Sequence, residues 1–245
     1  MEEALYDSAT LRQFAGIDLG SEPVPDETTV CKFRHLLEEH NLGEKILGSV
    51  NLHLQAKGVR ITTGTIVDAT LIHAPSSTKN RDQSRDPEMH QAKKGKNWYF
   101  GMKVHVGVDS KTKIIHTAVA TAANISDVAI LPDLLHGDET RVWGDGAYQG
   151  QTEVIRECAP RARDYTQRRC RYKNQIVDPV AWAKNRTKSK VRAKVEHVFQ
   201  VMKLKFGFVK VRYRGLKKNA QRLFVTCALV NLFVSRKKLL RLAVA

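Results

Sequence analysis

Residues 191–205, VRAKVEHVFQVMKLK, are the stretch from which the fold of this chain can be worked out. Apolar side chains recur there at intervals of three and four, at Val191, Val195, Val198, Phe199 and Met202. That spacing places them on one face of an α-helix. A polar stripe adjoins this face, at Ser189, Arg192, Glu196, Gln200 and Lys203. The stretch therefore predicts a helix packed on a core, with Glu196 at the border between core and solvent.

Glu196 is the only acidic residue between Asp178 and the C-terminus, a span that holds 18 lysines and arginines. A lone carboxylate in such basic surroundings is either an ion-pair partner or a functional group. Spacing alone favours the first interpretation, an Arg192–Glu196 pair on a solvated helix face. The positions of other acidic residues in the chain are needed to distinguish an ion-pair partner from a functional group.

The chain has 245 residues and a formal net charge of +16, and this charge is distributed unevenly. Residues 151–245 contain 25 Lys and Arg against 5 Asp and Glu, whereas residues 1–150 contain 16 against 20. A basic half of this density predicts a polyanionic partner, and nucleic acid is the most common one. A membrane surface or a ribosomal scaffold is the alternative.

Cysteine and histidine patterns exclude several classes of protein. The cysteines, Cys31, Cys158, Cys170 and Cys227, form no CxxC pair, which argues against a structural zinc site and a disulfide framework. The nine histidines form no HExxH or similar motif. No signal peptide is visible, and the most apolar stretch, 223–234, is too short to span a bilayer. We therefore expect a cytoplasmic protein with no membrane partner.

Residues 1–58 have helical apolar spacing and form the first expected region. Helices are predicted at 3–14, 27–40 and 44–57, with Asp26 or Thr28 capping the second. We interpret this region as a helical packing or assembly module, with a DNA-reading helix-turn-helix as the alternative. The second expected region is an α/β domain over residues 59–245.

Strands are predicted next. Residues 65–72, TIVDATLI, are β-branched and apolar except for Asp68. An acid in that position needs a hydrogen bond, an ion pair or a metal, unless it lies on an edge strand and faces solvent. Residues 98–109 and 114–122 alternate in polarity and predict a β-hairpin, after a long loop over 74–97.

The second acid of interest follows a short strand. Residues 140–143 lead directly into Gly144-Asp145-Gly146-Ala147-Tyr148, so Asp145 lies on a tight turn at the end of a strand. Open α/β sheets bind ligands at that edge, although Asp-Gly is also an ordinary turn pair. Helices at 124–135, capped by Ser126 and bent at Pro132, and at 151–158 are predicted around this strand.

Residues 162–166 predict a short strand, and residues 167–190 form a basic run that includes Tyr172 and Trp182. Basic residues interleaved with aromatic ones suit a nucleic-acid backbone with occasional stacking. If the strands carrying Asp68 and Asp145 are neighbours, these acids and Glu196 converge. Such a carboxylate set suits two Mg²⁺ or Mn²⁺ ions that assist phosphodiester displacement.

The chain resembles the DDE transposases of bacterial insertion sequences, in the group named for insertion sequences four and five. The resemblance covers roughly residues 59–235. It rests on GTIVDATLI (64–72), YFGMKVHVGVD (99–109), ANISD (123–127), GDGAY (144–148) and the Glu196 helix. The helix matches the Tyr-x2-Arg-x3-Glu-x6-Lys signature at Arg192, Glu196 and Lys203, with Ser189 in place of the tyrosine.

This resemblance implies an RNase H-like mixed sheet flanked by helices, with Asp68, Asp145 and Glu196 as the metal-binding catalytic triad. It also implies that Arg192 and Lys203 contact DNA near the active site. We add as predicted DNA contacts the residues Lys188, Lys190, Arg168, Arg169 and Tyr148. Expected partners are double-stranded DNA, with terminal inverted repeats and target DNA, and a second copy of the chain. The family usually has a longer helical N-terminal region, so we expect a truncated copy.

Two alternatives stay open beside transposition. One is an RNase H-like nuclease that cuts without joining, and the other is an inactive DNA-binding remnant of a transposase.

Overall fold

A computed structural model describes residues 1–170 and 178–244, and the chain divides into two compact units, Met1–Leu42 and Gly43–Ala245. The small unit contains α1 (Glu2–Asp7), α2 (Ala9–Ala15) and α3 (Glu27–Glu39). The expected helix over 3–14 is divided at Ser8, whose extended backbone ends α1 and whose hydroxyl caps α2. Asp26 caps α3 as predicted, because its carboxylate accepts the Thr29 N–H over 2.7 Å.

Helix α4 (Leu42–Ala56) packs in the larger unit, although we predicted it as part of the helical region of residues 1–58. Leu47 and Leu54 are buried there, and the Gly43 N–H donates to the Gln221 side chain over 2.9 Å. A functional boundary after residue 58 stays a prediction.

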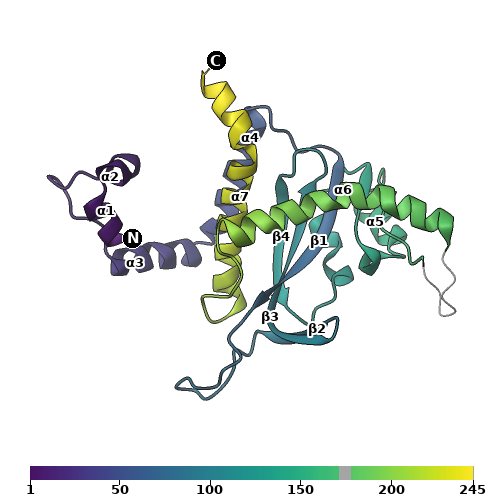
Figure 1. The fold of residues 1–245 in the computed structure, drawn as a ribbon, viewed down its shortest axis with the longest axis horizontal. Coiled ribbons are helices and arrows are strands. Elements are labelled where there is room, and N and C mark those ends of the chain that lie inside the picture. The colour runs from purple at the N-terminus through teal and green to yellow at the C-terminus, as the bar shows by residue number, and fades with distance from the viewer. Residues whose placement is uncertain (171–177, 245) are drawn as a thin grey trace. The chain divides into compact units, whose positions relative to one another are not determined.

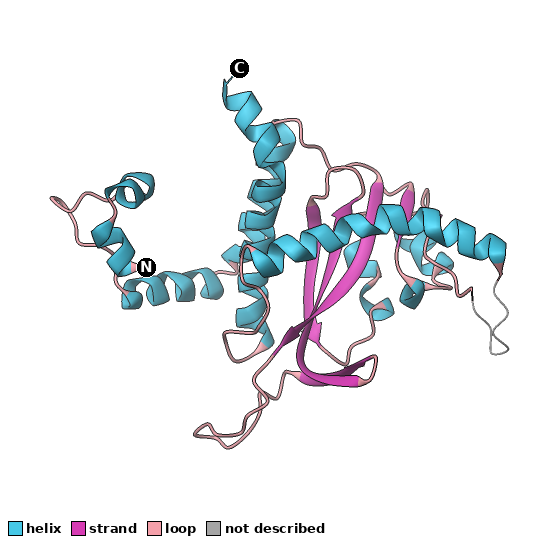
Figure 2. Cartoon of the chain, in the orientation of Figure 1, coloured by secondary structure: helices cyan, strands magenta, loops and turns pink. Residues whose placement is uncertain are grey.

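A mixed six-stranded sheet forms the centre of the larger unit (Figure 2). Its strands are β1 (Gly64–His73), β2 (His90–Lys94), β3 (Asn97–Asp109), β4 (Ile115–Ala122), β5 (Arg141–Trp143) and β6 (Arg163–Asp164). The order is β2-β3-β1-β5-β6, with β4 also paired to β3. Strand β1 is antiparallel to β3 and parallel to β5, and β5 is parallel to β6. The predicted hairpin of β3 and β4 is confirmed.

The two faces of the sheet have separate cores because side chains alternate along each strand. On β1, Ile66 and Ile72 pack in the core formed with α6 (Pro179–Leu204) and α7 (Leu216–Val244), while Val67 faces the opposite way. That second core is closed by α5 (Thr152–Cys158) and a turn before β5. The expected α/β fold with helices on a mixed sheet is confirmed (Figure 1).

Helix α6 has the buried face that its sequence predicts. Val195, Val198 and Met202 are fully buried, and Phe199 is 6% exposed. Each such side chain contributes on the order of 1.5–3 kcal/mol when it is removed from water. The helix is therefore held firmly over the sheet, which fixes the polar stripe beside this face.

Two sequence expectations are wrong in detail. Residues 124–135 form two short 3₁₀ turns, η1 (Val128–Ile130) and η2 (Pro132–Leu134), because Pro132 has no N–H for a continuous α-helix. The expected loop over 74–97 contains β2, a polar strand held by pairing with β3 rather than by an apolar pattern.

Among the helices of the described residues, none combines the length and apolarity needed to cross a bilayer.

Candidate active site

Asp68 and Asp145 are brought together by the parallel pairing of β1 and β5. Ile66 pairs with Trp143, and continuing this register by two residues places Asp68 level with Asp145. Strand β1 lies inside the sheet, between β3 and β5, and Asp68 is 8% exposed. The edge-strand interpretation of Asp68 is therefore wrong.

The turn after β5 holds Asp145 in a defined orientation. Its Oδ1 accepts the Ala147 N–H over 2.9 Å and so caps η3 (Gly146–Tyr148). A Cβ at Gly144 would lie 2.9 Å from the Tyr148 ring, so a larger residue there would push the turn away. Asp145 has the strand-end position predicted from the sequence, with a partly exposed side chain.

Glu196 reaches the same region from α6, the helix that packs on β1. The Arg192 Nη1 lies between two of the acids, donating to Asp68 Oδ2 over 2.8 Å and to Glu196 Oε1 over 3.1 Å. The Glu196 side chain is 59% exposed, against 12% for that of Asp68. The predicted Arg192–Glu196 pair exists, and it is part of a larger acidic site.

One cavity of about 730 Å³ joins the three carboxylates. Its lining includes Asp68, Asp145, Arg192, Glu196 and Lys203. Lys203 is anchored there because its Nζ donates to Thr70 Oγ1 over 2.6 Å. The structure thus places all three candidate acids and both signature cations around a single opening.

Among the other residues that line this cavity are Lys103 and Asp127, which sequence reasoning did not single out. Their side chains form an ion pair of 2.9 Å between β3 and the turn before η1. Both lie within segments that carry the resemblance, but only the folded hairpin shows that they meet. They add one positive and one negative charge to the cavity wall.

The pKa of the Asp68 carboxyl is raised to about 6, mainly by burial and to a smaller extent by the charges of Asp145 and Glu196. The Ala69 N–H and the Arg192 guanidinium oppose this effect. Mutual repulsion among the acids is relieved by a cation placed between them.

The donor set fits hard divalent cations. Carboxylate oxygens are the ligands that Mg²⁺ and Mn²⁺ prefer, and the three acids line one opening. The Arg192 guanidinium supplies a positive charge between Asp68 and Glu196.

The predicted DNA contacts of the basic run separate into two groups. Arg168 and Arg169 are exposed and line a second cavity of about 900 Å³, together with Trp182. Lys190 is exposed, whereas Lys188 is partly buried and its Nζ donates to the Thr166 carbonyl over 2.6 Å. Tyr172 lies outside the described residues.

Tyr148 has a different environment from the one predicted. Its side chain is 1% exposed and packs in the core under β5. A DNA contact would require this ring to leave the core, so the structure does not support that role. The sequence signal, an aromatic residue next to Asp145, did not reveal that Gly144 gives the ring room to pack inward.

Ser189, which replaces the tyrosine of the signature, lines the second cavity. Its Oγ accepts a hydrogen bond of 2.6 Å from Gln167 Nε2, which links α6 to the strand β6 region. The small side chain leaves the space beside Trp182 and Asn185 open.

The chain matches a known protein family over most of its length. Residues 60–232 match the family described as "Transposase DDE domain". No solved structure matches the chain at a significant level. The matched range contains Asp68, Asp145 and Glu196.

Proposed function

Because this chain belongs to the family of transposase DDE domains, we propose that it hydrolyses DNA at the ends of an insertion sequence and then joins the freed ends to target DNA. The observation that supports this proposal best is the single cavity lined by Asp68, Asp145 and Glu196. Hydrolysis and joining are both phosphodiester displacements, and one carboxylate site serves both. The assignment to the group of insertion sequences four and five, and the truncation, stay predictions.

Asp68, Asp145 and Glu196 are the proposed metal ligands. When bound, two Mg²⁺ or Mn²⁺ ions supply activation of a water or 3′-hydroxyl and stabilisation of the leaving oxygen. Asp68 presents its oxygens from β1, Asp145 from the turn after the adjacent strand β5, and Glu196 from helix α6, which packs on β1.

The cations of the cavity have separate proposed roles. Arg192 restricts the rotamers of both Asp68 and Glu196 through its two hydrogen bonds, and so holds them toward one another. Lys203 lies about two turns beyond Glu196 on α6 and offers its ammonium group to a DNA phosphate. A phosphate entering here meets positive charge beside the carboxylates.

Arg168, Arg169 and Lys190 extend the positive surface beyond the cavity, and we propose that they contact the backbone of double-stranded DNA. Cutting two element ends requires two active sites, so we also propose a homodimer on DNA. Action on terminal inverted repeats and target DNA in the cytoplasm follows from the same proposal.

Metal-dependent cleavage of DNA that carries the terminal repeats of the element tests the proposal. Asp145→Asn and Glu196→Gln should each lower cleavage at least about 100-fold, because each removes an anionic oxygen from the metal site. Glu153→Gln, at an exposed position of α5, is the matched control. Full activity in the Asp145 or Glu196 variant would refute the proposed roles.

A strand-transfer assay with precut ends separates transposition from simple hydrolysis. Joined products are expected from a transposase, whereas a nuclease would only degrade the DNA. DNA binding without cleavage at any Mg²⁺ or Mn²⁺ concentration would instead identify an inactive remnant.

A further inference from the structure

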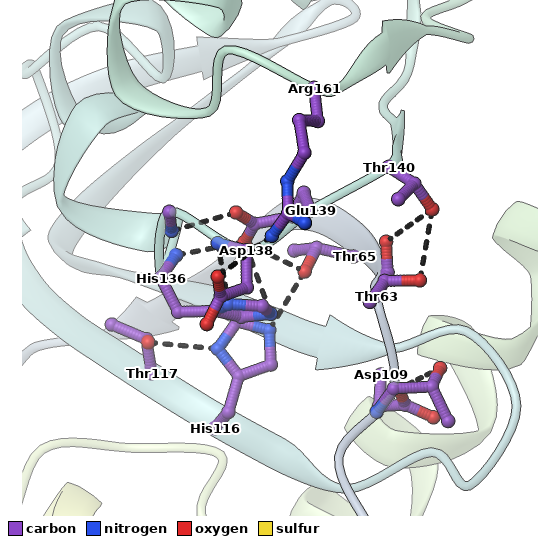
Figure 3. Close-up of polar contacts among 12 residues, drawn as sticks. Thr63, Thr65, Asp109, His116, Thr117, His136, Asp138, Glu139, Thr140 and Arg161 are labelled. Carbon is purple, nitrogen blue, oxygen red and sulfur yellow. Dashed lines mark hydrogen bonds and ion pairs between the residues drawn. The ribbon is translucent and has the colours of Figure 1, made fainter.

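A second cluster of ligand-type side chains lies at the other end of β5 from Asp145. His116, His136 and Glu139 each offer one ligand atom, and these atoms lie within 4.8 Å of one another (Figure 3). Glu139 precedes β5, whereas Asp145 follows it, so the cluster is separate from the cavity of the three acids. The sequence shows no motif for it, because His116 comes from β4 and the other two residues from the segment after η2.

Glu139 is a fully buried carboxylate held in one orientation. Its Oε1 accepts hydrogen bonds from the backbone N–H of His136 over 2.8 Å and from the Thr65 hydroxyl over 3.1 Å. Its Oε2 accepts one from the backbone N–H of Gly137 over 2.8 Å. Among the described residues, no lysine or arginine pairs with it, and its one ion-pair contact is with His136 Nε2 at 3.4 Å. A buried carboxylate without a permanent cation is costly unless another positive charge is supplied.

His116 is directed into this cluster by an irregularity of the sheet. Gly107 pairs with Thr117 and Val108 with Ile115, so His116 is an additional residue in β4 at a β-bulge. A Cβ on Gly107 would lie 2.6 Å from His116 Cε1, so only glycine leaves space for the ring. Bulges commonly redirect a side chain toward a functional site.

Each imidazole has one nitrogen on the side of the cluster: His136 Nε2 lies 3.4 Å from Glu139 Oε1, and His116 Nε2 lies 3.2 Å from Thr65 Oγ1. His116 Nδ1 lies 2.9 Å from Thr117 Oγ1, and a hydrogen bond of this kind orients a metal-binding imidazole. The two imidazoles meet edge to face, with centroids 5.0 Å apart.

We propose that His116, His136 and Glu139 form a binding site for a zinc-type transition-metal cation. Two imidazoles and one carboxylate are a ligand set that Zn²⁺ uses, with water as the fourth ligand. Its bond lengths of about 2.0–2.2 Å require ligand atoms roughly 3.4 Å apart, so the cluster must contract on binding. We expect His136 to make this movement, because its side chain is 25% exposed and its Nδ1 accepts only a long hydrogen bond of 3.3 Å from the Asp138 N–H.

The site joins β4 to the segment that leads into β5. Strand β5 has three residues, and Asp145 lies two residues beyond its end. A cation here fixes the start of the strand whose far end presents that acid. The inference does not depend on the proposed transposition, because it concerns other residues and a softer class of metal.

Zinc retention by the full chain tests this site. The protein is stripped with a chelator, incubated with one equivalent of Zn²⁺ in excess Mg²⁺, desalted and measured by elemental analysis. We expect one retained Zn²⁺ per chain, and a rise in melting temperature over the stripped protein. His136→Ala should lose both, because it removes one of the three protein ligands of the site.

The control is an Asp145→Asn and Glu196→Gln double variant, which should retain zinc as the unmodified protein does. Co²⁺ should give the visible absorption of a four-coordinate site in the unmodified chain and not in His136→Ala. Glu139→Gln is a second variant, but His136→Ala is decisive because its side chain is partly exposed and its loss should not prevent folding. Absence of retained zinc, equal retention in His136→Ala, or loss in the double variant would each overturn the proposal.

Discussion

Arg192 Nη1 donates to Asp68 Oδ2 over 2.8 Å and so joins helix α6 to strand β1 across 124 positions of sequence. Both side chains are largely buried, at 25% and 12% exposure. Arg192 is therefore the internal counter-ion of a carboxylate that we propose as a metal ligand. The same guanidinium also reaches Glu196, so one arginine balances part of the negative charge of the site.

The variant Arg192→Ala tests how much this guanidinium offsets the negative charge of the site. Without the guanidinium, a buried carboxylate is left beside two others, and we expect a loss of about 1–3 kcal/mol in the free energy of unfolding without Mg²⁺. Added Mg²⁺ should raise the melting temperature of the variant more than that of the unmodified protein, because the cation replaces the lost charge. Arg161→Ala, which removes an exposed pair with Asp138, is the control. Equal melting temperatures for both variants would contradict the prediction.

Arg168 and Arg169 should contribute to DNA affinity through phosphates. Each phosphate contact adds about 0.9 to the slope of log affinity against log salt concentration for duplex DNA. The Arg168→Ala, Arg169→Ala double variant should therefore bind more weakly at low salt and show a slope smaller by roughly 2. Fluorescence anisotropy with a duplex over a range of KCl measures both quantities. An unchanged slope would show that these side chains do not face DNA.

Much of the candidate site could be predicted because its residues lie in strongly patterned elements. Asp68 interrupts an apolar strand, and Asp145 lies in the glycine turn at the end of another, so local pattern places both. The buried face of α6 has a regular spacing, which fixes the side of the helix on which Glu196 lies. The sequence indicates that the three acids converge if the strands carrying Asp68 and Asp145 are neighbours. The register of β1 and β5 shows that β1 and β5 are paired.

The remaining features depend on long-range contacts that no local pattern encodes. Strand β2 is polar and exists through its pairing with β3. Tyr148 turns inward because Gly144 leaves room for its ring. The cluster of His116, His136 and Glu139 depends on a bulge in β4, which periodicity does not reveal.

Asp109 should make stability depend on pH in the acid range. It is fully buried at the end of β3, and it accepts hydrogen bonds from Thr62, Lys111 and Thr112. These bonds hold the pKa of its carboxyl below the ordinary 3.8, against the opposing effect of burial. A carboxyl with a lowered folded-state pKa stabilises the fold above its unfolded-state pKa, and this contribution is lost as pH falls.

Asp109→Asn should therefore reduce stability at pH 7 by about 1.5–3 kcal/mol, because an amide cannot accept all these hydrogen bonds. The variant should also lose part of the stability change that the unmodified protein shows as pH falls below about 4. Urea unfolding at pH 7 and pH 3 measures the difference. Asp133→Asn, at an exposed position, should behave as the unmodified protein at both values.

Asn231 connects three elements of the larger unit and should be important for its stability. On α7, its Oδ1 accepts the Ile115 N–H over 2.9 Å, and its Nδ2 donates to the Ile115 carbonyl over 2.8 Å. The same Nδ2 reaches Asn51 Oδ1 on α4 over 2.8 Å, and Asn51 Nδ2 donates to the same carbonyl over 3.1 Å. The backbone N–H and carbonyl of Ile115, which lies next to the β4 bulge, are thus both hydrogen-bonded by side chains.

Asn231→Ala leaves the buried Ile115 N–H without this partner and should cost about 1–3 kcal/mol. Asn51→Ala should cost less, because Asn231 still bonds both groups of Ile115. Trp98, Trp143 and Trp182 all lie in the larger unit, so tryptophan fluorescence during urea unfolding follows that unit alone. Asn124→Ala, at an exposed position, is the control. The reverse order of the Asn231 and Asn51 effects would show that α4, rather than α7, holds this strand in place.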